Sequence, residues 1–258
     1  VQSTPALRWL TGSMAAEIVI TGAHIWAQGP VDIGISGGHF VEPEVGPQTE
    51  VIEASGMTVV PGFQDAHVHT PFAGLNRLRV WLNDAETRED YLRIIAEHAA
   101  AHPGPEWITG GGWSMPQFPG GTPRKEDLDA IVSDRPVFLF NRDVHGAWVN
   151  STALAAAGIT AATPDPPDGR IERDPDTGEP TGTLHEGAAY WVNEHVVPPP
   201  SQTQWEKAIL NGQQHLHSLG ITGWQDAWVT PATQSAYRSL ANSGRLTGRV
   251  VGALWWDR

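Results

Sequence analysis

Apolar and polar residues alternate in short runs along the first part of the chain. The segment 31–35 carries an apolar residue at every second position and is followed by Gly37-Gly38, which predicts a strand that ends in a turn. Similar runs recur across residues 14–60 and predict several short antiparallel strands. They are too few for an independent sandwich, so we expect partner strands from elsewhere. Residues 1–13 show no clear period and are interpreted as an extension or tag.

The pattern changes after residue 69, where apolar runs of strand length alternate with segments of helical period. Thr87 and Asp90 predict a capped helix, because a threonine side chain can accept the backbone N–H three residues further on. The continuous apolar run 137–140 predicts a strand covered on both faces. The alternation predicts an α/β fold with a parallel sheet and right-handed crossovers. Residues 160–183 are rich in Pro, Asp and Gly and predict an excursion, such as a small hairpin.

The composition of the chain limits which partners and which cellular location we expect. A chain of 258 residues is long enough for one large domain, or one domain with a small appendage. Its formal net charge of −13 argues against nucleic acid as a partner, because phosphate contacts need basic patches. No apolar segment approaches the roughly 18 residues of a membrane span, which argues against a membrane partner. Cysteine is absent, which excludes thiolate ligands and disulfides, and we expect a cytoplasmic location.

The most informative stretch is 59–69, an apolar run that passes through Pro61-Gly62 and ends in two histidines. Side chains alternate along a strand, so His67 and His69 are expected to face the same way. Two imidazoles on one face can share a divalent ion, which makes a metal-dependent enzyme the leading interpretation. Asp65 could orient one imidazole by accepting its N–H, as partners of metal-bound histidines usually do. The alternative is two polar residues at a strand end, with no metal.

Three further residues are candidates for contact with a substrate. His145 follows the apolar run 137–140 and is interpreted as a pocket-wall hydrogen-bonding residue, with capping or packing as the alternative. Trp113 follows three glycines and could face a substrate or pack on the rim. Glu186 could line the site, approach the metal or serve as a structural acid. Asp226 also ends an apolar run, and we interpret it mainly as a structural anchor.

His215 and His217 repeat the same spacing in a different setting. They lie in a segment of helical period, where positions i and i+2 diverge by about 200°. We therefore expect no shared metal ion at this second pair.

The motifs resemble those of a known family. The stretch 60–69 (VPGFQDAHVH) is similar to the first barrel strand of the amidohydrolase superfamily, whose usual wording is PGxxDxHxH. Further matches point to the amidohydrolase-3 branch, which includes N-substituted formamide deformylases. These matches are 110–113 (GGGW), 143–151 (DVHGAWVNS), 174–186 (DPDTGEPTGTLHE) and 220–227 (GITGWQDA).

The resemblance implies a (β/α)8 TIM-type barrel whose first part is residues 61–258. Residues 14–60 would contribute to a small β-sandwich that the C-terminal end of the whole protein completes. The implied reaction is hydrolysis of the C–N bond of an N-substituted amide or formamide by a metal-activated water. The implied metal is one or two divalent ions, zinc by first choice, with His67 and His69 as ligands.

The resemblance also implies that this chain is the N-terminal portion of the catalytic unit. The general base, an aspartate, and the later metal ligands are expected outside it, in a C-terminal segment or a second chain that completes the barrel. In the complete enzyme Trp113 and His145 would shape and orient a small-molecule substrate.

Three alternatives stay open. A cupin-like barrel also carries two histidines on a strand, but it expects a glutamate shortly after them, and Thr70-Pro71-Phe72-Ala73-Gly74 follows here. The 12 tryptophans would suit a non-catalytic domain that binds a carbohydrate or another small molecule. The chain could also be an inactive fragment that keeps the fold without the chemistry. The sequence leaves the oligomeric state open, a homo-oligomer included.

Overall fold

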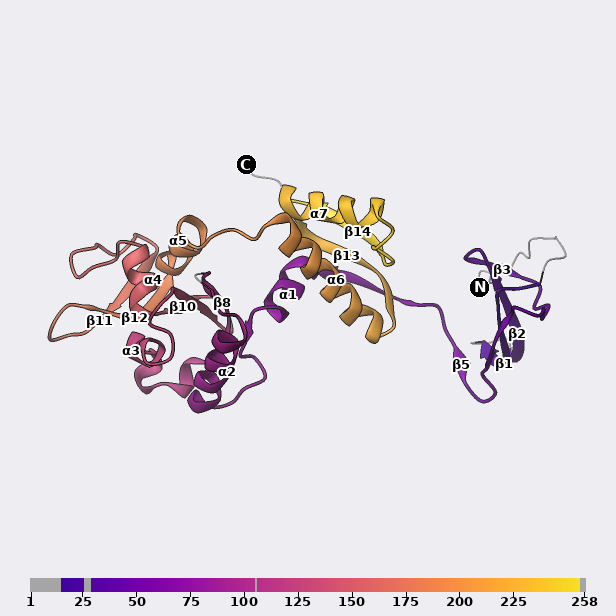
Figure 1. The fold of residues 1–258 in the computed structure, drawn as a ribbon, viewed down its shortest axis with the longest axis horizontal. Helices are drawn as coiled ribbons and strands as arrows, with labels where there is room; N and C mark the ends of the chain where they lie inside the picture. Colours follow the sequence, from indigo (N-terminus) through magenta and orange to yellow (C-terminus); the bar gives the residue numbers. More distant parts are fainter. Residues whose placement is uncertain (1–14, 26–28, 105, 256–258) are drawn as a thin grey trace, which may run out of the picture. The chain divides into compact units, whose positions relative to one another are not determined.

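The computed structural model describes residues 15–25, 29–104 and 106–255. The chain divides into two compact units, Val1–Gly62 and Phe63–Arg258, and most of their elements are labelled in Figure 1. The predicted extension 1–13 lies outside the described residues. Within the described residues, every helix is too short or too polar to cross a membrane.

The first unit is one small sheet of short strands. Its strands are β1 (Ile18–Ile25), β2 (Gly29–Ser36), β3 (His39–Val41), β4 (Glu50–Glu53) and β5 (Thr58–Val59). The predicted turn at Gly37-Gly38 joins β2 to β3, and both glycines have positive φ, as tight hairpin turns require. The strand order is β3-β2-β1-β4, with β5 also on β1.

The expectation of purely antiparallel strands in this unit is wrong. β1 pairs antiparallel with β2 but parallel with β4 and β5. The reason is the connection 42–49, which is long enough to carry the chain back past β1 before β4 begins. The buried core is small, Ala23, Ile33 and Ala54. The described part of this unit forms a single sheet, so the β-sandwich stays a prediction.

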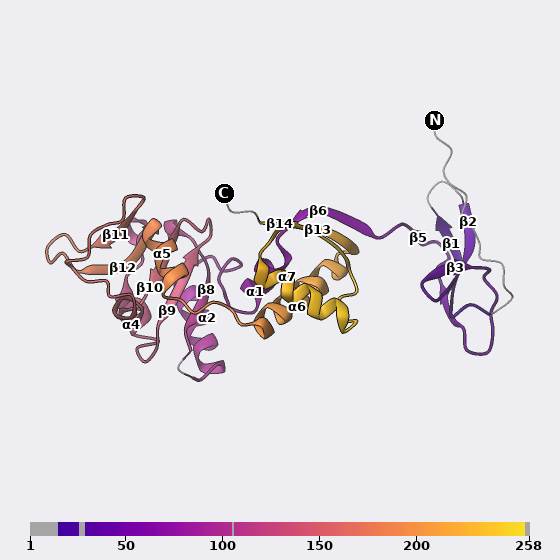
Figure 2. The same ribbon diagram turned by 90° about the horizontal axis from the view of Figure 1, so that it is seen from above.

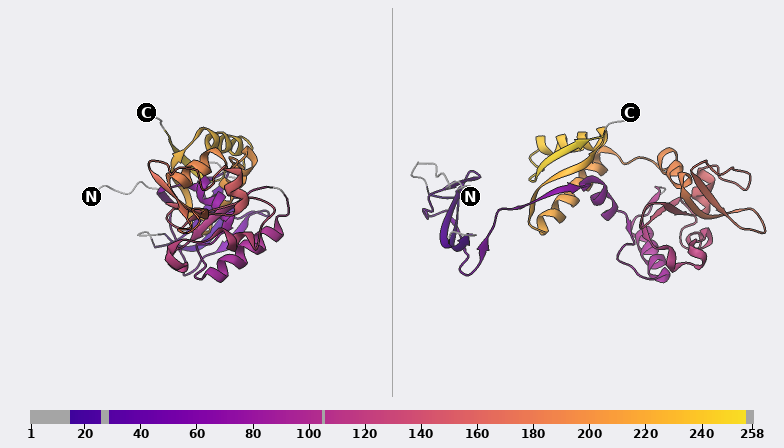
Figure 3. Two further views of the ribbon diagram at one scale, coloured as in Figure 1. Left: turned by 90° about the vertical axis from the view of Figure 1, so that its left-hand side faces the viewer. Right: turned by 180° about the vertical axis from the view of Figure 1, so that it is seen from behind.

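The second unit contains a sheet of three parallel strands in the order β14-β13-β6. These strands are β6 (Phe63–Val68), β13 (Ile221–Val229) and β14 (Arg249–Leu254). Helices α1 (Thr70–Arg77), α6 (Gln202–Ser218) and α7 (Pro231–Asn242) lie on one side of them, as Figures 2 and 3 show. Leu75, Ile209, Val229 and Leu240 are buried between these helices and the strands.

On the other face of the parallel sheet, side chains of the described residues are exposed. Val250 packs against the helices, whereas the next residue, Val251, points the opposite way and is 59% exposed. Phe63 is also exposed. Parallel strands are normally covered on both faces. β6 and β14 each pair only with β13 among the described residues, so both outer edges are open.

The same unit contains a second, mixed sheet in the order β11-β12-β10-β9-β8-β7. Its strands are β7 (Val80–Trp81), β8 (Ile108–Trp113), β9 (Val137–Asn141), β10 (Gly146–Val149), β11 (Gly169–Arg173) and β12 (Pro180–Glu186). Its helices are α2 (Arg88–Ala101), α3 (Lys125–Asp129), α4 (Ser151–Ala156) and α5 (Gly187–His195), with 3₁₀ turns at Met115–Gln117 and Pro119–Gly121. The excursion 160–183 contains most of the β11–β12 hairpin.

The prediction of one continuous parallel sheet after residue 61 is therefore wrong. β7, β8 and β9 are parallel, but β10, β12 and β11 follow in antiparallel pairs. Only four residues, 142–145, join β9 to β10, and that is too short for a parallel crossover. Residues 80–195 are thus inserted between the first and second strands of the parallel sheet. The described residues are of mixed α/β class and form no closed barrel.

Candidate metal and substrate site

His67 and His69 lie where β6 ends and α1 begins. His67 is the fifth residue of the strand, and His69 is the N-cap of the helix. Both side chains are exposed, and neither imidazole has a hydrogen bond within the described residues. Their ring centroids are 5.2 Å apart with an interplanar angle of 82°. The two rings are therefore neighbours with nitrogen atoms free to bind a ligand.

This spacing fits a shared metal ion. With Zn–N bonds of about 2.0–2.1 Å in a tetrahedral shell, two imidazoles on one ion have centroids roughly 5 Å apart. The observed 5.2 Å agrees with that spacing. Neutral imidazole is also the form of histidine that binds metals. In each ring the nitrogen that carries no hydrogen can bind zinc or a similar divalent ion.

The remaining ligands of such a site are not assembled in the described part of the chain. No group of three or more His, Asp or Glu side chains lies close enough there to hold a metal ion. Asp65 Oδ1 accepts the backbone N–H of His67 at 2.9 Å. That carboxylate therefore braces the strand next to the pair, whereas the predicted bond was to an imidazole.

Trp113 lies in the core of the six-stranded sheet. It is 1% exposed, and its indole N–H donates to the carbonyl oxygen of Leu139 at 2.8 Å. Its ring meets Phe118 and Trp148 edge-on. With its polar atom bonded and its faces packed, Trp113 has no free surface for a substrate in this structure. Of its two predicted roles, packing is the one observed.

The glycines before Trp113 serve the packing of strands. A Cβ atom on Gly110 would lie 2.2 Å from the carbonyl oxygen of Val80, and one on Gly111 would lie 2.3 Å from that of Phe140. Both distances are far below van der Waals contact. Glycine therefore lets β8 fit between β7 and β9.

His145 and Glu186 are brought together by strand register. β10 pairs antiparallel with β12, and Gly146 lies opposite His185. This register places His145 beside Glu186, whose backbone N–H donates to the His145 carbonyl oxygen at 2.8 Å. The side chains meet as well, with His145 Nδ1 3.0 Å from Glu186 Oε2. Two candidates from distant sequence positions thus form one site.

Tyr190 completes this cluster and was missed in the sequence. Its hydroxyl group donates to Glu186 Oε2 at 3.1 Å and lies 3.1 Å from His145 Nδ1. Tyr190 follows Glu186 by four residues on α5, which is one helical turn. That spacing was the available signal, but it required recognition of the helix 187–195.

The electrostatics of the cluster favour an ion pair. The hydrogen bond from His145 holds the pKa of the Glu186 carboxyl below its ordinary value. The same bond raises the pKa of the His145 imidazole, with a smaller contribution from the charge of Asp143. Because an ionised carboxylate only accepts hydrogen bonds, Nδ1 of His145 carries the hydrogen.

Asp226 is buried beneath the same end of the parallel sheet as the histidine pair. It is 0% exposed, and its Oδ2 accepts the hydroxyl group of Tyr237 at 2.8 Å. Its Oδ1 accepts the backbone N–H of Trp228 at 3.2 Å. Burial raises the pKa of this carboxyl. These contacts agree with its interpretation as a structural anchor.

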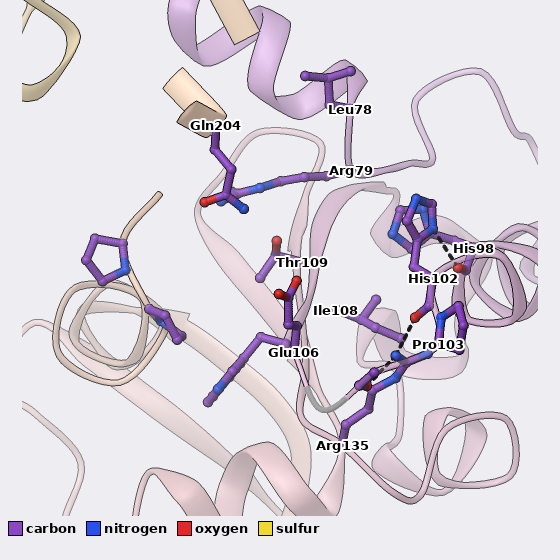
Figure 4. A pocket seen from close by; sticks show the side chains of 14 residues that line it. Leu78, Arg79, His98, His102, Pro103, Glu106, Ile108, Thr109, Arg135 and Gln204 are labelled. Atoms are coloured by element: carbon purple, nitrogen blue, oxygen red, sulfur yellow. Dashed lines mark hydrogen bonds between the residues drawn. The ribbon is translucent and has the colours of Figure 1, made fainter. Parts of the chain in front are cut away.

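A cavity of about 750 Å³ lies elsewhere, at the start of β8. Figure 4 shows Arg79 reaching towards Gln204 across it, with His98 and His102 on the far side. None of the site residues predicted from the sequence lines this cavity. Its walls combine basic, apolar and polar residues with one carboxylate, that of Glu106, and no group of three or more metal-binding side chains forms there among the described residues.

Comparison with known proteins agrees with the motifs. The chain matches the amidohydrolase family over residues 50–256. It is 33% identical to N-substituted formamide deformylase of Arthrobacter pascens over 210 residues, which are 78% of this chain and 38% of that protein. It is 37% identical to the putative amidohydrolase YtcJ of Bacillus subtilis strain 168 over 180 residues, 69% of this chain and 33% of that protein. The chain thus spans well under half the length of these relatives.

Two crystal structures share the fold. An uncharacterized metal-dependent hydrolase from Pyrococcus furiosus superposes with a TM-score of 0.65 at 24% identity, over 92% of this chain and 50% of that one. An uncharacterized metal-dependent hydrolase from Pyrococcus horikoshii OT3 gives a TM-score of 0.64 at 22% identity, over 92% of this chain and 48% of that one. At such identities the likeness establishes fold. The family match over residues 50–256, most of its length, shows that this chain belongs to the amidohydrolase family.

Proposed function

We propose that this chain is part of a metal-dependent hydrolase that cleaves the C–N bond of an N-substituted amide or formamide. The observation that carries the proposal is the pair of exposed imidazoles, 5.2 Å apart at the end of β6. Family membership supports it, and so does the name of the Arthrobacter pascens relative, an N-substituted formamide deformylase. A small-molecule substrate suits this chemistry better than a peptide.

In this proposal His67 and His69 hold a divalent ion, with zinc as the first choice. When bound, such an ion supplies a Lewis acid for the carbonyl oxygen and lowers the pKa of a water molecule towards about 7. Asp65 keeps the strand in shape through its bond to the His67 N–H. The general base and the remaining ligands would come from polypeptide beyond the described residues, since no group of three or more His, Asp or Glu side chains able to hold an ion forms within them.

We further propose that β6, β13 and β14 are the first three strands of a (β/α)8 barrel. Their parallel order and their helices on one side are the arrangement of such a barrel. The bare face and the open edges would be covered when the remaining strands pack against them. Exposed Val51 and Ile52 on β4 similarly suit a sandwich that gains strands. The cytoplasmic location and the homo-oligomer stay predictions.

The tryptophan-rich binding alternative has less support. Trp113, Trp148, Trp205 and Trp224 are buried and so are not placed to stack on a sugar, which leaves Trp191, Trp228 and Trp255 as the exposed tryptophans of the described residues. The cupin alternative requires an all-β fold, whereas the histidine pair here precedes a helix in an α/β unit.

The direct test is an assay of the complete purified protein with an N-substituted formamide and a matched N-substituted acetamide. We expect water to split at least one of them into an amine and a carboxylate. A chelator should stop the reaction and zinc should restore it. If the metal-loaded protein cleaves no N-substituted amide of either series, the proposed function is wrong.

A further inference from the structure

We propose that Trp228 is a positioning residue for His69. By edge-on aromatic contact it holds the imidazole in the orientation that lets this ring share an ion with His67. The tryptophan takes the place of the hydrogen-bonded carboxylate or carbonyl group that usually orients a metal-bound histidine. This inference rests on the proposed function, because the ion is the one that the proposed hydrolase uses.

The hydrogen-bonded partner that orients most metal ligands is not found at His69. Metal-binding histidines almost always donate their second ring N–H to a carboxylate, a backbone carbonyl or water. Within the described residues the His69 ring has no hydrogen bond to protein, and its side chain does not cap α1. Asp65 Oδ1 accepts a backbone N–H, and both oxygens of Asp226 accept hydrogen bonds from groups other than an imidazole. The structure offers this ring an aromatic contact instead.

Strand register brings Trp228 to His69. β13 runs parallel to β6, and Asp226 lies opposite Val68. The residues that follow in the two strands therefore emerge at the same end of the sheet. The ring centroids of Trp228 and His69 are 6.2 Å apart, with an interplanar angle of 87°. This edge-on arrangement lies within the range of about 4.5–7 Å over which aromatic rings attract each other.

Trp228 is itself held in place by a row of rings. It stacks on Phe72 with centroids 4.5 Å apart and an interplanar angle of 13°. Phe72 meets Trp205 edge-on at 5.2 Å, and Trp205 belongs to the buried core between the helices and the parallel sheet. On another side, the ring of Trp255 lies 5.7 Å from that of Trp228. The exposed imidazole is thus connected through rigid aromatic contacts to the buried core, which limits its rotation.

A role for Trp228 that is confined to core packing has weaker support. Its side chain is 38% exposed and lies outside the buried core, to which the next residue, Val229, contributes at 4% exposure. The two roles also differ in what they predict. Core packing alone predicts that loss of the ring lowers stability and leaves metal affinity unchanged. Positioning predicts that metal affinity falls, because a mobile ligand must be ordered when the ion binds.

The test is calorimetric zinc titration of the complete protein after removal of metal. Trp228→Leu keeps apolar bulk but removes the ring, so it should weaken zinc binding roughly 2- to 12-fold, the value of one aromatic contact beyond its buried area. Trp228→Phe keeps a ring and should recover most of the affinity. Chemical denaturation of each variant separates a loss of affinity from a loss of fold.

Trp191→Leu is the matched control. Trp191 is 46% exposed on α5, and its ring also contacts a histidine, that of His195, with centroids 5.4 Å apart. The control therefore removes a comparable tryptophan–histidine contact away from the proposed metal site. It should leave zinc affinity unchanged, and equal losses in Trp191→Leu and Trp228→Leu would overturn the inference.

A second measurement uses the metal-free protein and needs neither zinc nor turnover. NMR relaxation of ¹³C-labelled histidine rings reports how far each imidazole moves. The His69 ring should become more mobile in Trp228→Leu and keep its wild-type order in Trp228→Phe and Trp191→Leu. Unchanged zinc affinity or unchanged ring mobility in Trp228→Leu would overturn the positioning role. Absence of zinc uptake by the wild-type protein would count against the proposed function, since the ring measurement still decides whether Trp228 orients His69.

Discussion

The histidines at the two sheets of the second unit differ in their hydrogen bonding. At the end of β6 in the parallel sheet, His67 and His69 are exposed, lie next to each other and have no hydrogen-bonded partner in the described residues. In the inserted mixed sheet, His145 is bonded to Glu186 and lies against Tyr190. His67 and His69 therefore have ring nitrogens available to an ion. In the second cluster, the hydrogen bonds of Glu186 and Tyr190 hold the His145 ring in place.

The two sheets also differ in how completely they are covered by other elements. Among the described residues the parallel sheet has a bare face and two open edges, where the proposed remaining barrel strands would pack. The six-stranded sheet buries two clusters of its own, one around Tyr91 and Trp148 and the other around Phe138 and Leu184. Under the proposed function, the metal chemistry would belong to the parallel sheet that carries the exposed histidine pair.

The largest expected effect comes from removing the imidazole pair. The double substitution His67→Ala, His69→Ala should lower kcat/KM of the complete protein by more than about 100-fold, because even residues that only orient metal ligands cost about 10–100-fold. The matched control is His215→Ala, His217→Ala, which removes the same spacing from exposed positions of α6. Similar losses in both variants would show that the pair on β6 has no special role.

The next effect concerns the core of the inserted sheet. Trp113→Ala should lower the free energy of unfolding by about 3–5 kcal/mol, because it removes a large buried ring and leaves a cavity. Trp191→Ala, at a position 46% exposed on α5, should cost less than about 1 kcal/mol. Chemical denaturation of both variants measures the difference. A mild effect of Trp113→Ala together with a raised KM would restore the substrate-facing role.

A smaller effect is expected at the anchor of the parallel sheet. Asp226→Ala leaves the buried hydroxyl group of Tyr237 without its acceptor, which should cost about 1–3 kcal/mol of stability. Tyr237→Phe added to Asp226→Ala should recover part of that loss. If the double variant is less stable by the sum of the two single changes, the two side chains do not act through their hydrogen bond.

The smallest effect is a shift in protonation. Glu186 raises the pKa of His145, so Glu186→Gln should lower that pKa towards its ordinary value, as an NMR titration of the imidazole would show. A raised folded-state pKa stabilises the protein fully below the unfolded value and loses that contribution as pH rises through the folded value. The free energy of unfolding of the wild-type protein, relative to that of Glu186→Gln, should therefore fall as the pH rises from the unfolded-state pKa of the imidazole through its folded-state pKa. Tyr190→Phe, which keeps the carboxylate, should leave the elevation largely in place.

Local sequence patterns predicted local structure correctly. Thr87 caps α2 as predicted, with its hydroxyl oxygen accepting the Asp90 N–H at 3.1 Å. The run 137–140 forms a buried strand, β9. The capped-helix and strand rules depend on neighbours a few residues apart, so the sequence alone contains the necessary information.

Pairings between distant segments were harder to predict. β13 pairs with β6 across the whole insertion, and no local pattern in either strand names its partner. The four-residue connection at 142–145 was the one signal that the sheet would turn antiparallel. Trp113 illustrates the same point, because the strand β8 extends to include it and the neighbouring strands determine what its ring meets. Tertiary packing decides which residues from distant segments come into contact, and the local sequence does not show it.

The central claim is tested most directly by zinc titration of the metal-free protein, followed by calorimetry and by the ring signals of ¹⁵N-labelled histidines. The account predicts saturable uptake that shifts the signals of His67 and His69, is lost in His67→Ala, His69→Ala and persists in His215→Ala, His217→Ala. Uptake that is unchanged in the first variant, or that leaves the His67 and His69 signals in place, would contradict it.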